Sequence, residues 1–390
     1  MNSCRLFASG FRPMFLAAGL AAVALVPLWM ALWAFGASLA TPWPPTLWHA
    51  HEMVFGFIAA AIAGFLLTAV PSWTGQRGFA GAPLILLVTL WLAGRVTIVG
   101  ASALPVWLVM AVDVAFLPAL ALLVAPPLLR ARNRNTPLLL VLALLTLCNA
   151  WFHWALIRQN PVSASHALLI AIDLVLLLVT VIGGRILPAF TASGLRAAGH
   201  PVRIRVWPAI GPAAIVAMAC VALGDLLWPD SRVAGLLAGA AAVLQGVRLI
   251  QWRSAATLGQ PIVWVLHLAY AWLPVGLALK SAALLGQSAI SAFWLHALTI
   301  GVLATMILGV MSRAALGHTG RPLVVEPAIA LAYGLLLLAA LTRVFGLAVT
   351  PLDYVTVIVV AASFWTAAFA IFLYVYAPIL WGARADGKPG

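Results

Sequence analysis

Residues 48–65, WHAHEMVFGFIAAAIAGF, place two histidines and a glutamate directly in front of a run of almost pure hydrocarbon. Such a run is typical of a helix that crosses the hydrocarbon core of a bilayer, which is about 30 Å thick and needs about 20 apolar residues. An ionisable side chain at the edge of that core is unfavourable unless a partner compensates its polarity. His49, His51 and Glu52 are therefore expected to have such a partner.

Similar apolar runs recur along the whole chain. Of the 390 residues, 65% are hydrophobic and 7% are charged, whereas a soluble domain carries about 25% charged residues. The runs predict an all-α polytopic membrane protein that forms a single membrane domain over residues 1–390 and whose surroundings are the lipid bilayer. Its twelve transmembrane helices are predicted near 14–36, 50–73, 83–101, 105–129, 137–158, 165–190, 207–228, 231–252, 262–285, 291–313, 326–346 and 353–381.

Positive charge gathers at one end of these helices. After the N-terminal Arg5 and Arg12, basic residues follow every second span: Arg77, Arg130, Arg132, Arg134, Arg196, Arg203, Arg205, Arg253, Arg321, Arg384 and Lys388. The loops at the opposite end carry little beyond Arg158 and Arg232. By the positive-inside rule both termini are predicted to be cytoplasmic. Because the arginines are scattered over loop ends, the net charge of +13 reflects topology and does not indicate a nucleic-acid partner.

A shift of 245 positions aligns the second span with the tenth. It places His51, Gly56, Gly64, Thr74 and Gly75 on His296, Gly301, Gly309, Thr319 and Gly320. The sixth span is a weaker third copy, which begins with His166 and ends in FTASGLR. We therefore predict three repeated four-helix units, over residues 1–135, 136–258 and 259–390, and such repeats often hold a site at their interface. Duplication of a scaffold without a site is the alternative.

Both aligned helices carry small residues four positions apart, Gly56-Ala60-Gly64 and Gly301-Thr305-Gly309. Such a stripe lets helix backbones approach each other closely in a bilayer. At about 100° per residue, His51 lies roughly 140° away from Gly56 and so off the stripe. The histidine is therefore expected to face a different neighbour from the one that the glycines touch.

With this topology, five histidines fall on the outer half of the membrane: His49, His51, His153, His166 and His296. A single histidine at a helix end is usually a hydrogen-bonded side chain. Five of them in one leaflet favour a metal site, because neutral imidazole is the commonest metal-ligand side chain. Imidazole suits copper, zinc and iron, and it also supplies the axial ligands of haem.

The spacing of the first two histidines limits what they can bind. His49 and His51 point about 160° apart in an ideal helix, so they cannot readily share one ion. Either Pro44 and Pro45 make this helix entry irregular, or the two histidines serve different partners, such as one metal each. Glu52 is the candidate catalytic residue, since it could ligate a metal, orient an imidazole or carry protons.

A basic group lies at the predicted inner end of the tenth span, formed by Arg313, His318 and Arg321. One interpretation is charge that only sets the topology. The other is a clamp for haem propionates or another anion, because arginine forks suit carboxylates. His267 lies at a similar depth and is a further candidate cofactor-binding residue. The chain has no CxxCH attachment motif, so any haem is expected to be non-covalent haem b.

Five motifs give the chain a family resemblance. They are GFRPMF at 10–15, HAHEMVFGFIAAAIAGFLLTAVPSWTG at 49–75, GGRILPAF at 183–190, HLAYAWLPVGL at 267–277 and HALTIGVLATMILGVMSRAALGHTGRPL at 296–323. With these motifs the chain resembles the NnrS family of bacterial inner-membrane proteins along almost its whole length. The resemblance implies a protein of about twelve spans that contains haem and copper and is linked to nitric oxide metabolism and resistance to nitrosative stress.

The resemblance does not say which histidine serves haem and which serves copper. The residues carried by its motifs are His49, His51, Glu52, His267, His296, Arg313 and His318. His153 and His166 lie outside the motifs, so only the topology supports them as metal ligands.

Two hypotheses about function follow. The first is a haem and copper protein that binds or converts nitric oxide, and that acts as a redox enzyme if it receives electrons from a donor that the sequence does not identify. The second is a proton-coupled secondary transporter for a metal or a small substrate related to nitrogen oxides, which repeats and buried charges suit equally well. A purely structural membrane scaffold is a third interpretation, and the outer histidines argue against it.

Overall fold

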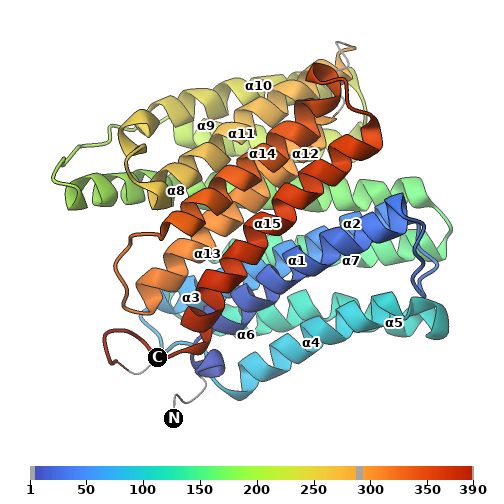
Figure 1. Cartoon of the computed structure of the whole chain (residues 1–390), viewed down its shortest axis with the longest axis horizontal. Helices are drawn as coiled ribbons and strands as arrows, with labels where there is room; N and C mark the ends of the chain where they lie inside the picture. The colour runs from blue at the N-terminus through green and yellow to red at the C-terminus, as the bar shows by residue number, and fades with distance from the viewer. Residues whose placement is uncertain (1–4, 287–292, 389–390) are drawn as a thin grey trace. The chain divides into compact units, whose positions relative to one another are not determined.

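The computed structural model describes residues 5–286 and 293–388, and within these ranges the regular structure is helical with no β-strand (Figure 1). The helical segments are α1 (Phe11–Ala34), α2 (Pro45–His51), the π-helix η2 (Glu52–Ile58), α3 (Ala59–Thr74), α4 (Ala82–Val99), α5 (Val106–Val114), α6 (Phe116–Arg130), α7 (Leu138–Ile157), α8 (Pro161–Ala197), α9 (Ile210–Leu227), α10 (Arg232–Ile250), α11 (Pro261–Leu284), α12 (Trp294–His296), the π-helix η6 (Ala297–Ala304), α13 (Thr305–His318), α14 (Pro327–Val349) and α15 (Tyr354–Trp381). The described part also contains three short 3-10 turns, Leu6–Ala8, Ala101–Ala103 and Ser254–Thr257.

The prediction of twelve membrane spans is confirmed. Twelve helices in the described part are long and apolar enough to cross a membrane, with α2, η2 and α3 forming one of them and α12, η6 and α13 another. The sixth span was predicted over 165–190, but α8 runs from Pro161 to Ala197. The polar segment after Phe190 continues the helix to Ala197, and Gly199 follows in a turn with a φ of +80°, which suits glycine just after a helix C-terminus.

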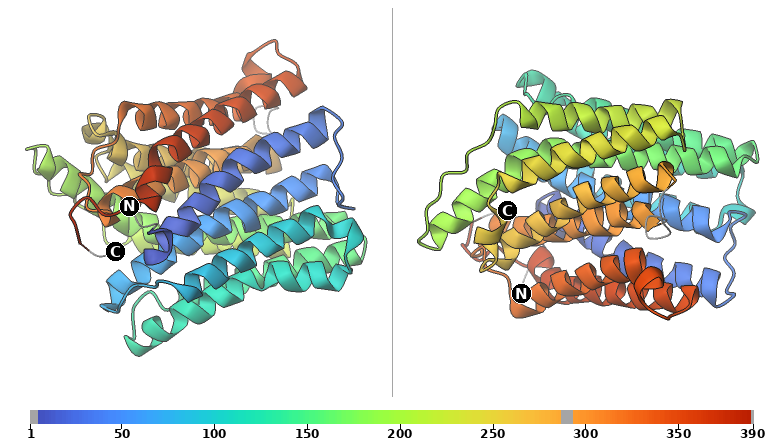
Figure 2. Two further views of the ribbon diagram at one scale, coloured as in Figure 1. Left: turned by 60° about the horizontal axis from the view of Figure 1, so that its bottom comes forward. Right: turned by 90° about the horizontal axis from the view of Figure 1, so that it is seen from above.

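Contacts divide the chain into two compact units. The first comprises Met1–Ala171, Arg313–Pro322 and Phe369–Gly390, and the second comprises Ile172–Ser312 and Leu323–Ala368. In the first unit α3 packs against α1 and α6, and α7 packs against α5 and α6 (Figure 2). In the second unit α10 packs against α9 and α11. The division of the chain into three repeated units stays a prediction.

The two π-helical segments lie 245 residues apart, which is the spacing of the predicted repeat. Each begins directly after an aligned histidine, η2 after His51 and η6 after His296. η2 packs against α1 and α4, and η6 packs against α11 and α14. The aligned spans thus share a local backbone irregularity as well as residues, and π-helical turns of this kind are frequent at functional sites.

The aligned glycines lie where neighbouring helices touch. A Cβ added to Gly64 would lie 2.5 Å from Cδ1 of Phe15 on α1, and one added to Gly309 would lie 2.8 Å from Cδ2 of Leu266 on α11. Real Cβ atoms do not approach other atoms so closely. The small-residue stripe therefore does what the sequence predicts: it lets α3 pack closely against α1 at Gly64, and α13 against α11 at Gly309.

This packing predicts that Gly64→Ala destabilises the protein. The added methyl group overpacks the contact with Phe15, which typically costs about 1–3 kcal/mol of the free energy of unfolding. The matched control is Gly334→Ala, also within a helix, where a Cβ would meet nothing within 4 Å and where alanine is the better helix former. Thermal unfolding of the detergent-purified variants measures the difference. Equal midpoints for the two variants would show that the α1–α3 contact is not tightly packed.

Candidate metal centre

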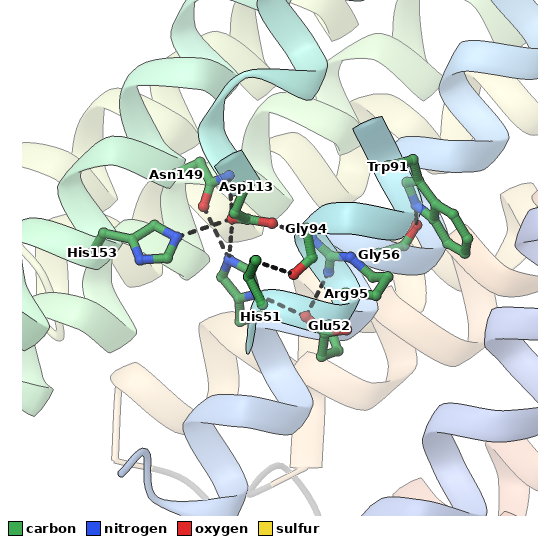
Figure 3. Close-up of polar contacts among 10 residues, drawn as sticks. His51, Glu52, Gly56, Trp91, Gly94, Arg95, Asp113, Asn149 and His153 are labelled. Carbon is green, nitrogen blue, oxygen red and sulfur yellow. Dashed lines mark hydrogen bonds and ion pairs between the residues drawn. The ribbon is translucent and has the colours of Figure 1, made fainter. Parts of the chain in front are cut away.

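Six polar side chains from five helical segments meet inside the first unit (Figure 3). We call them the histidine cluster: His51 at the end of α2, Glu52 at the start of η2, Arg95 on α4, Asp113 on α5, and Asn149 and His153 on α7. All are buried except Arg95, whose side chain is 11% exposed. Charged and polar groups at such burial need partners, because burial removes them from bulk solvent.

One oxygen of Asp113 is the centre of the cluster. Its Oδ2 atom lies 3.1 Å from Nε2 of His51 and 2.9 Å from Nε2 of His153. It also accepts a hydrogen bond of 2.8 Å from Nδ2 of Asn149. The ligand atoms of His51, Asp113 and His153 all lie within 4.8 Å of one another, and these three form a group that could hold a metal ion among the described residues.

Both ring nitrogens of His51 face oxygen atoms. Nδ1 lies 3.2 Å from Oε1 of Glu52, while Nε2 faces Asp113 Oδ2 and lies 3.0 Å from Oδ1 of Asn149. A neutral imidazole carries a single N–H and can donate on one side only. If Nδ1 donates to Glu52, the lone pair of Nε2 points at two acceptors. A cation in front of Nε2, either a metal ion or a proton, removes this conflict.

Arg95 joins the two carboxylates of the cluster. Its Nη1 atom donates to Oε1 of Glu52 at 2.5 Å, and its Nη2 atom donates to Oδ1 of Asp113. With neutral histidines, one guanidinium and two carboxylates leave a net charge of −1 inside the protein. The second oxygen of Glu52, Oε2, is buried and has no hydrogen-bond partner in the described part of the chain. Charge balance and this acceptor both favour a bound cation.

Aromatic rings enclose His51. Trp43, Phe55 and Phe152 lie with ring centroids 5.3, 5.1 and 4.6 Å from the imidazole. The ring of Trp43 also lies edge-on to His153, at 5.5 Å. These rings keep water away from the nitrogen and oxygen donors, so electrostatic interactions inside the cluster are stronger than they would be in water.

Local backbone structure makes room for these contacts. At the π-helix η2 the regular α-helical hydrogen bonding is interrupted, and Trp91 Nε1 on α4 donates to the carbonyl oxygen of Gly56 at 2.9 Å. A Cβ on Gly56 would lie 3.0 Å from Nη1 of Arg95, and one on Gly94 would lie 3.1 Å from Oδ1 of Asp113. Glycine at both positions lets the guanidinium and the carboxylate approach the neighbouring backbone.

Comparison with known proteins agrees with the motifs. The family model described as NnrS protein matches residues 5–384, which is nearly the whole chain. The chain belongs to the NnrS family. No protein of curated function matches it.

The structure brings together two of the five histidines predicted as metal ligands in this NnrS chain. His51 and His153 belong to the histidine cluster, whereas His49 stacks on Trp29 at 4.2 Å and His166 lies edge-on to Trp151 at 5.2 Å. His49 and His51 thus have different neighbours, as their helical spacing predicts. His296 lies in the second unit, half-buried, between α12 and η6.

Three members of the cluster, Arg95, Asp113 and Asn149, were not predicted as site residues. Asp113 stands alone in a run of apolar residues, and Asn149 occupies a similar position on α7. An ionisable residue inside a membrane span is by default a sign of a functional site, so the signal for Asp113 was present. What the sequence does not give is its partner, because α5, α2 and α7 meet only in the folded chain.

The predicted cofactor-binding residues at the other helix ends have separate surroundings. In the second unit, His267 Nε2 lies 2.7 Å from Oγ1 of Thr191 and its Nδ1 lies 2.9 Å from Oγ of Ser254. In the first unit, His318 packs against Phe11 with ring centroids 5.6 Å apart. Arg313 is half-buried and lies on the same helix as His318.

His318 also lines a partly open cavity of about 360 Å³. Its other lining residues are Ser9, Gly10, Phe11, Leu67, Thr68, Pro71, Ser72, Gln76, Gly78, Phe79 and Arg384. Arg384 is paired with Asp386 at 2.6 Å. This hydrogen bond lowers the pKa of Asp386 and raises that of Arg384, so both groups are charged at neutral pH.

The bridging position of Arg95 predicts that Arg95→Ala strongly destabilises the protein. Removing the guanidinium leaves two buried carboxylates without their counter-charge, which typically costs about 3–5 kcal/mol of the free energy of unfolding. The control is Arg158→Ala, an exposed arginine at the end of α7; we expect a change within about 0.5 kcal/mol there. Denaturant unfolding in detergent measures both.

A second variant tests the charge argument itself. Adding Glu52→Gln to Arg95→Ala removes one of the uncompensated charges, and we expect it to restore part of the lost stability. Such a positive coupling between two residues in contact is measured by a double-mutant cycle. If the two substitutions are simply additive, Arg95 does not act by neutralising Glu52.

Proposed function

We propose that the protein is a bacterial inner-membrane metalloprotein that binds or converts nitric oxide and so protects the cell against nitrosative stress. In this proposal a copper ion is held by the histidine cluster near the periplasmic side, and a haem b is bound elsewhere in the chain. Two observations support it: the chain belongs to the NnrS family, and the cluster has the donor atoms of a metal centre.

The copper proposal rests mainly on the surroundings of the two ring nitrogens of His51. Both of its ring nitrogens face oxygen acceptors. The two carboxylates of Glu52 and Asp113 and the one guanidinium of Arg95 together carry a net charge of −1. Nε2 of His51, Nε2 of His153 and Oδ2 of Asp113 would ligate the ion. Imidazole nitrogen suits copper, and carboxylate oxygen completes a mixed donor set that also suits non-haem iron.

The other residues of the cluster position these donors. Glu52 accepts from Nδ1 of His51 and so keeps Nε2 deprotonated and turned toward Asp113; carboxylate–histidine pairs of this kind are common behind metal ligands. Arg95 holds both carboxylates in place. The free oxygen of Glu52 can accept a proton, which keeps this residue as the candidate for proton transfer. Copper, when bound, supplies a redox-active centre that coordinates nitric oxide.

The haem part of the proposal is supported by membership of the NnrS family and by the position of His318, one of the predicted cofactor-binding histidines. Both ring nitrogens of His267 lie within hydrogen-bonding distance of hydroxyl groups, so His267 offers no free nitrogen for iron. His318 and Arg384 both line the cavity of about 360 Å³. The volume of this cavity lies within the usual range for ligand pockets, about 300–1,000 Å³. His318 is the residue that would hold haem iron, and Arg313 keeps its predicted role as a partner for a propionate.

The copper proposal predicts a selective loss of metal. We expect His51→Ala, His153→Ala and Asp113→Asn each to lower the copper content of the purified protein by about tenfold or more, since even changes behind the ligands cost 10–100-fold in affinity. His166→Ala, a matched histidine in the same unit, should keep its copper. Elemental analysis and electron paramagnetic resonance of the copper signal measure this. Iron in place of copper, or unchanged metal in His51→Ala, would contradict it.

The haem proposal predicts a different pattern of variants. We expect the purified protein to show a haem absorption band in the visible spectrum that is lost in His318→Ala and kept in His51→Ala and His267→Ala. Loss of the band in His267→Ala alone would assign the iron to that residue instead. A colourless, metal-free protein that couples proton flux to a substrate would overturn both parts and favour the secondary transporter.

A further inference from the structure

The second unit contains another buried group of charges, on helices that the histidine cluster does not use. It consists of Asp173 on α8, Asp225 on α9 and Lys280 on α11, each about 1% exposed. Lys280 Nζ donates to Oδ2 of Asp225, and it also lies 4.7 Å from the centre of the Trp294 ring. The carboxyl groups of Asp173 and Asp225 lie close enough to interact with each other. The proposed function uses none of these residues.

A hydrogen bond between two carboxyl groups requires a proton. Ionised carboxylates only accept hydrogen bonds, so two neighbouring carboxyl groups can be joined by a hydrogen bond only if one of them is protonated. Two carboxylates close together also resist ionising at the same time, because their charges repel each other. With Lys280 charged, one ionised and one protonated carboxyl group make the site neutral. Loss of the proton would leave a net charge of −1 in a buried place.

One oxygen of the pair has no partner. Oδ2 of Asp173 is buried and has no hydrogen-bond partner in the described part of the chain. A buried carboxyl oxygen without a donor is unfavourable, so it indicates a position where a ligand or a water molecule interacts. This atom separates the site from an ordinary lysine–aspartate ion pair, in which Asp173 would have no part.

The group lies close to helix ends. Asp225 comes two residues before the end of α9 at Leu227, and Lys280 comes four residues before the end of α11 at Leu284. The charge distribution predicts that the loops following these ends face the outside. The charged residues that act on Asp173 are Asp225 and Lys280, while α12 contributes the uncharged ring of Trp294.

From these contacts we infer that Asp173 and Asp225 form a proton-binding site in which the two carboxyl groups share one exchangeable proton and Lys280 is the fixed counter-ion. Release breaks the O–H bond of the protonated carboxyl group and transfers the proton to water, which leaves both groups ionised; uptake reverses this step, and no group is oxidised or reduced. The inference does not depend on copper or haem.

Infrared spectroscopy of the intact protein in liposomes tests the inference. We expect a band from a protonated carboxyl group that shifts in D₂O and loses amplitude as the pH is raised. It should be absent in Asp173→Asn and present in Asp230→Asn, a matched aspartate in the exposed loop after α9. Should Asp173→Asn fail to fold, Asp173→Glu keeps a carboxyl group, and the band should then be displaced and not abolished.

Three results would overturn the inference. A band that does not change with pH would mean a permanent proton and a purely structural pair, and no band at all would mean that both groups are ionised. A band lost on adding sodium at constant pH would mean a site for a metal cation. The measurement is repeated on copper-depleted protein; we expect the same titration there, so failure of the metal proposal leaves this result unaffected.

Discussion

The first unit depends on the pairing of Arg95 with the two buried carboxylates of Glu52 and Asp113. The guanidinium of α4 holds Glu52 of η2 and Asp113 of α5, so one side chain links three segments of the chain. Each contact then fixes a neighbour: Glu52 orients one side of the His51 ring, and Asp113 faces the other. Glycines at 56 and 94 leave room for these charges, because a Cβ would lie 3.0 Å from Nη1 of Arg95 at the first position and 3.1 Å from Oδ1 of Asp113 at the second.

The two π-helical segments, η2 and η6, have the same backbone irregularity but different side chains. Both follow a histidine and both pack against two helices of their own unit. Under the predicted shift of 245 residues, however, Ala297 stands where the first segment has Glu52. The irregular backbone is therefore present in both spans, while the carboxylate that orients the histidine is present in one. This difference indicates that the π-helical turn is part of the scaffold and that the charges at the first one make the site.

The sequence predicted the helices well and the cluster in part, for physical reasons. Hydrocarbon thickness imposes a length and an apolar composition on each span, so the spans can be read from local sequence. The separation of His49 from His51 is also local, because it follows from helical geometry. The meeting of His51 with Asp113 and His153 is not local: it depends on which faces of α2, α5 and α7 adjoin, and nothing in the sequence around each residue specifies its partner.

The two buried groups share one electrostatic feature, and their donor atoms separate their chemistry. Each has two carboxylates and one basic side chain, so each needs one more positive charge. Around Asp113 two imidazole nitrogens converge on the carboxylate oxygen, which suits a transition metal. Among the described residues no imidazole joins Asp173 and Asp225 in a group of metal ligands, and the ammonium group of Lys280 is already paired with Asp225. That ammonium would repel a divalent ion at close range, whereas a proton bound between two oxygens adds the missing charge without needing space for coordination.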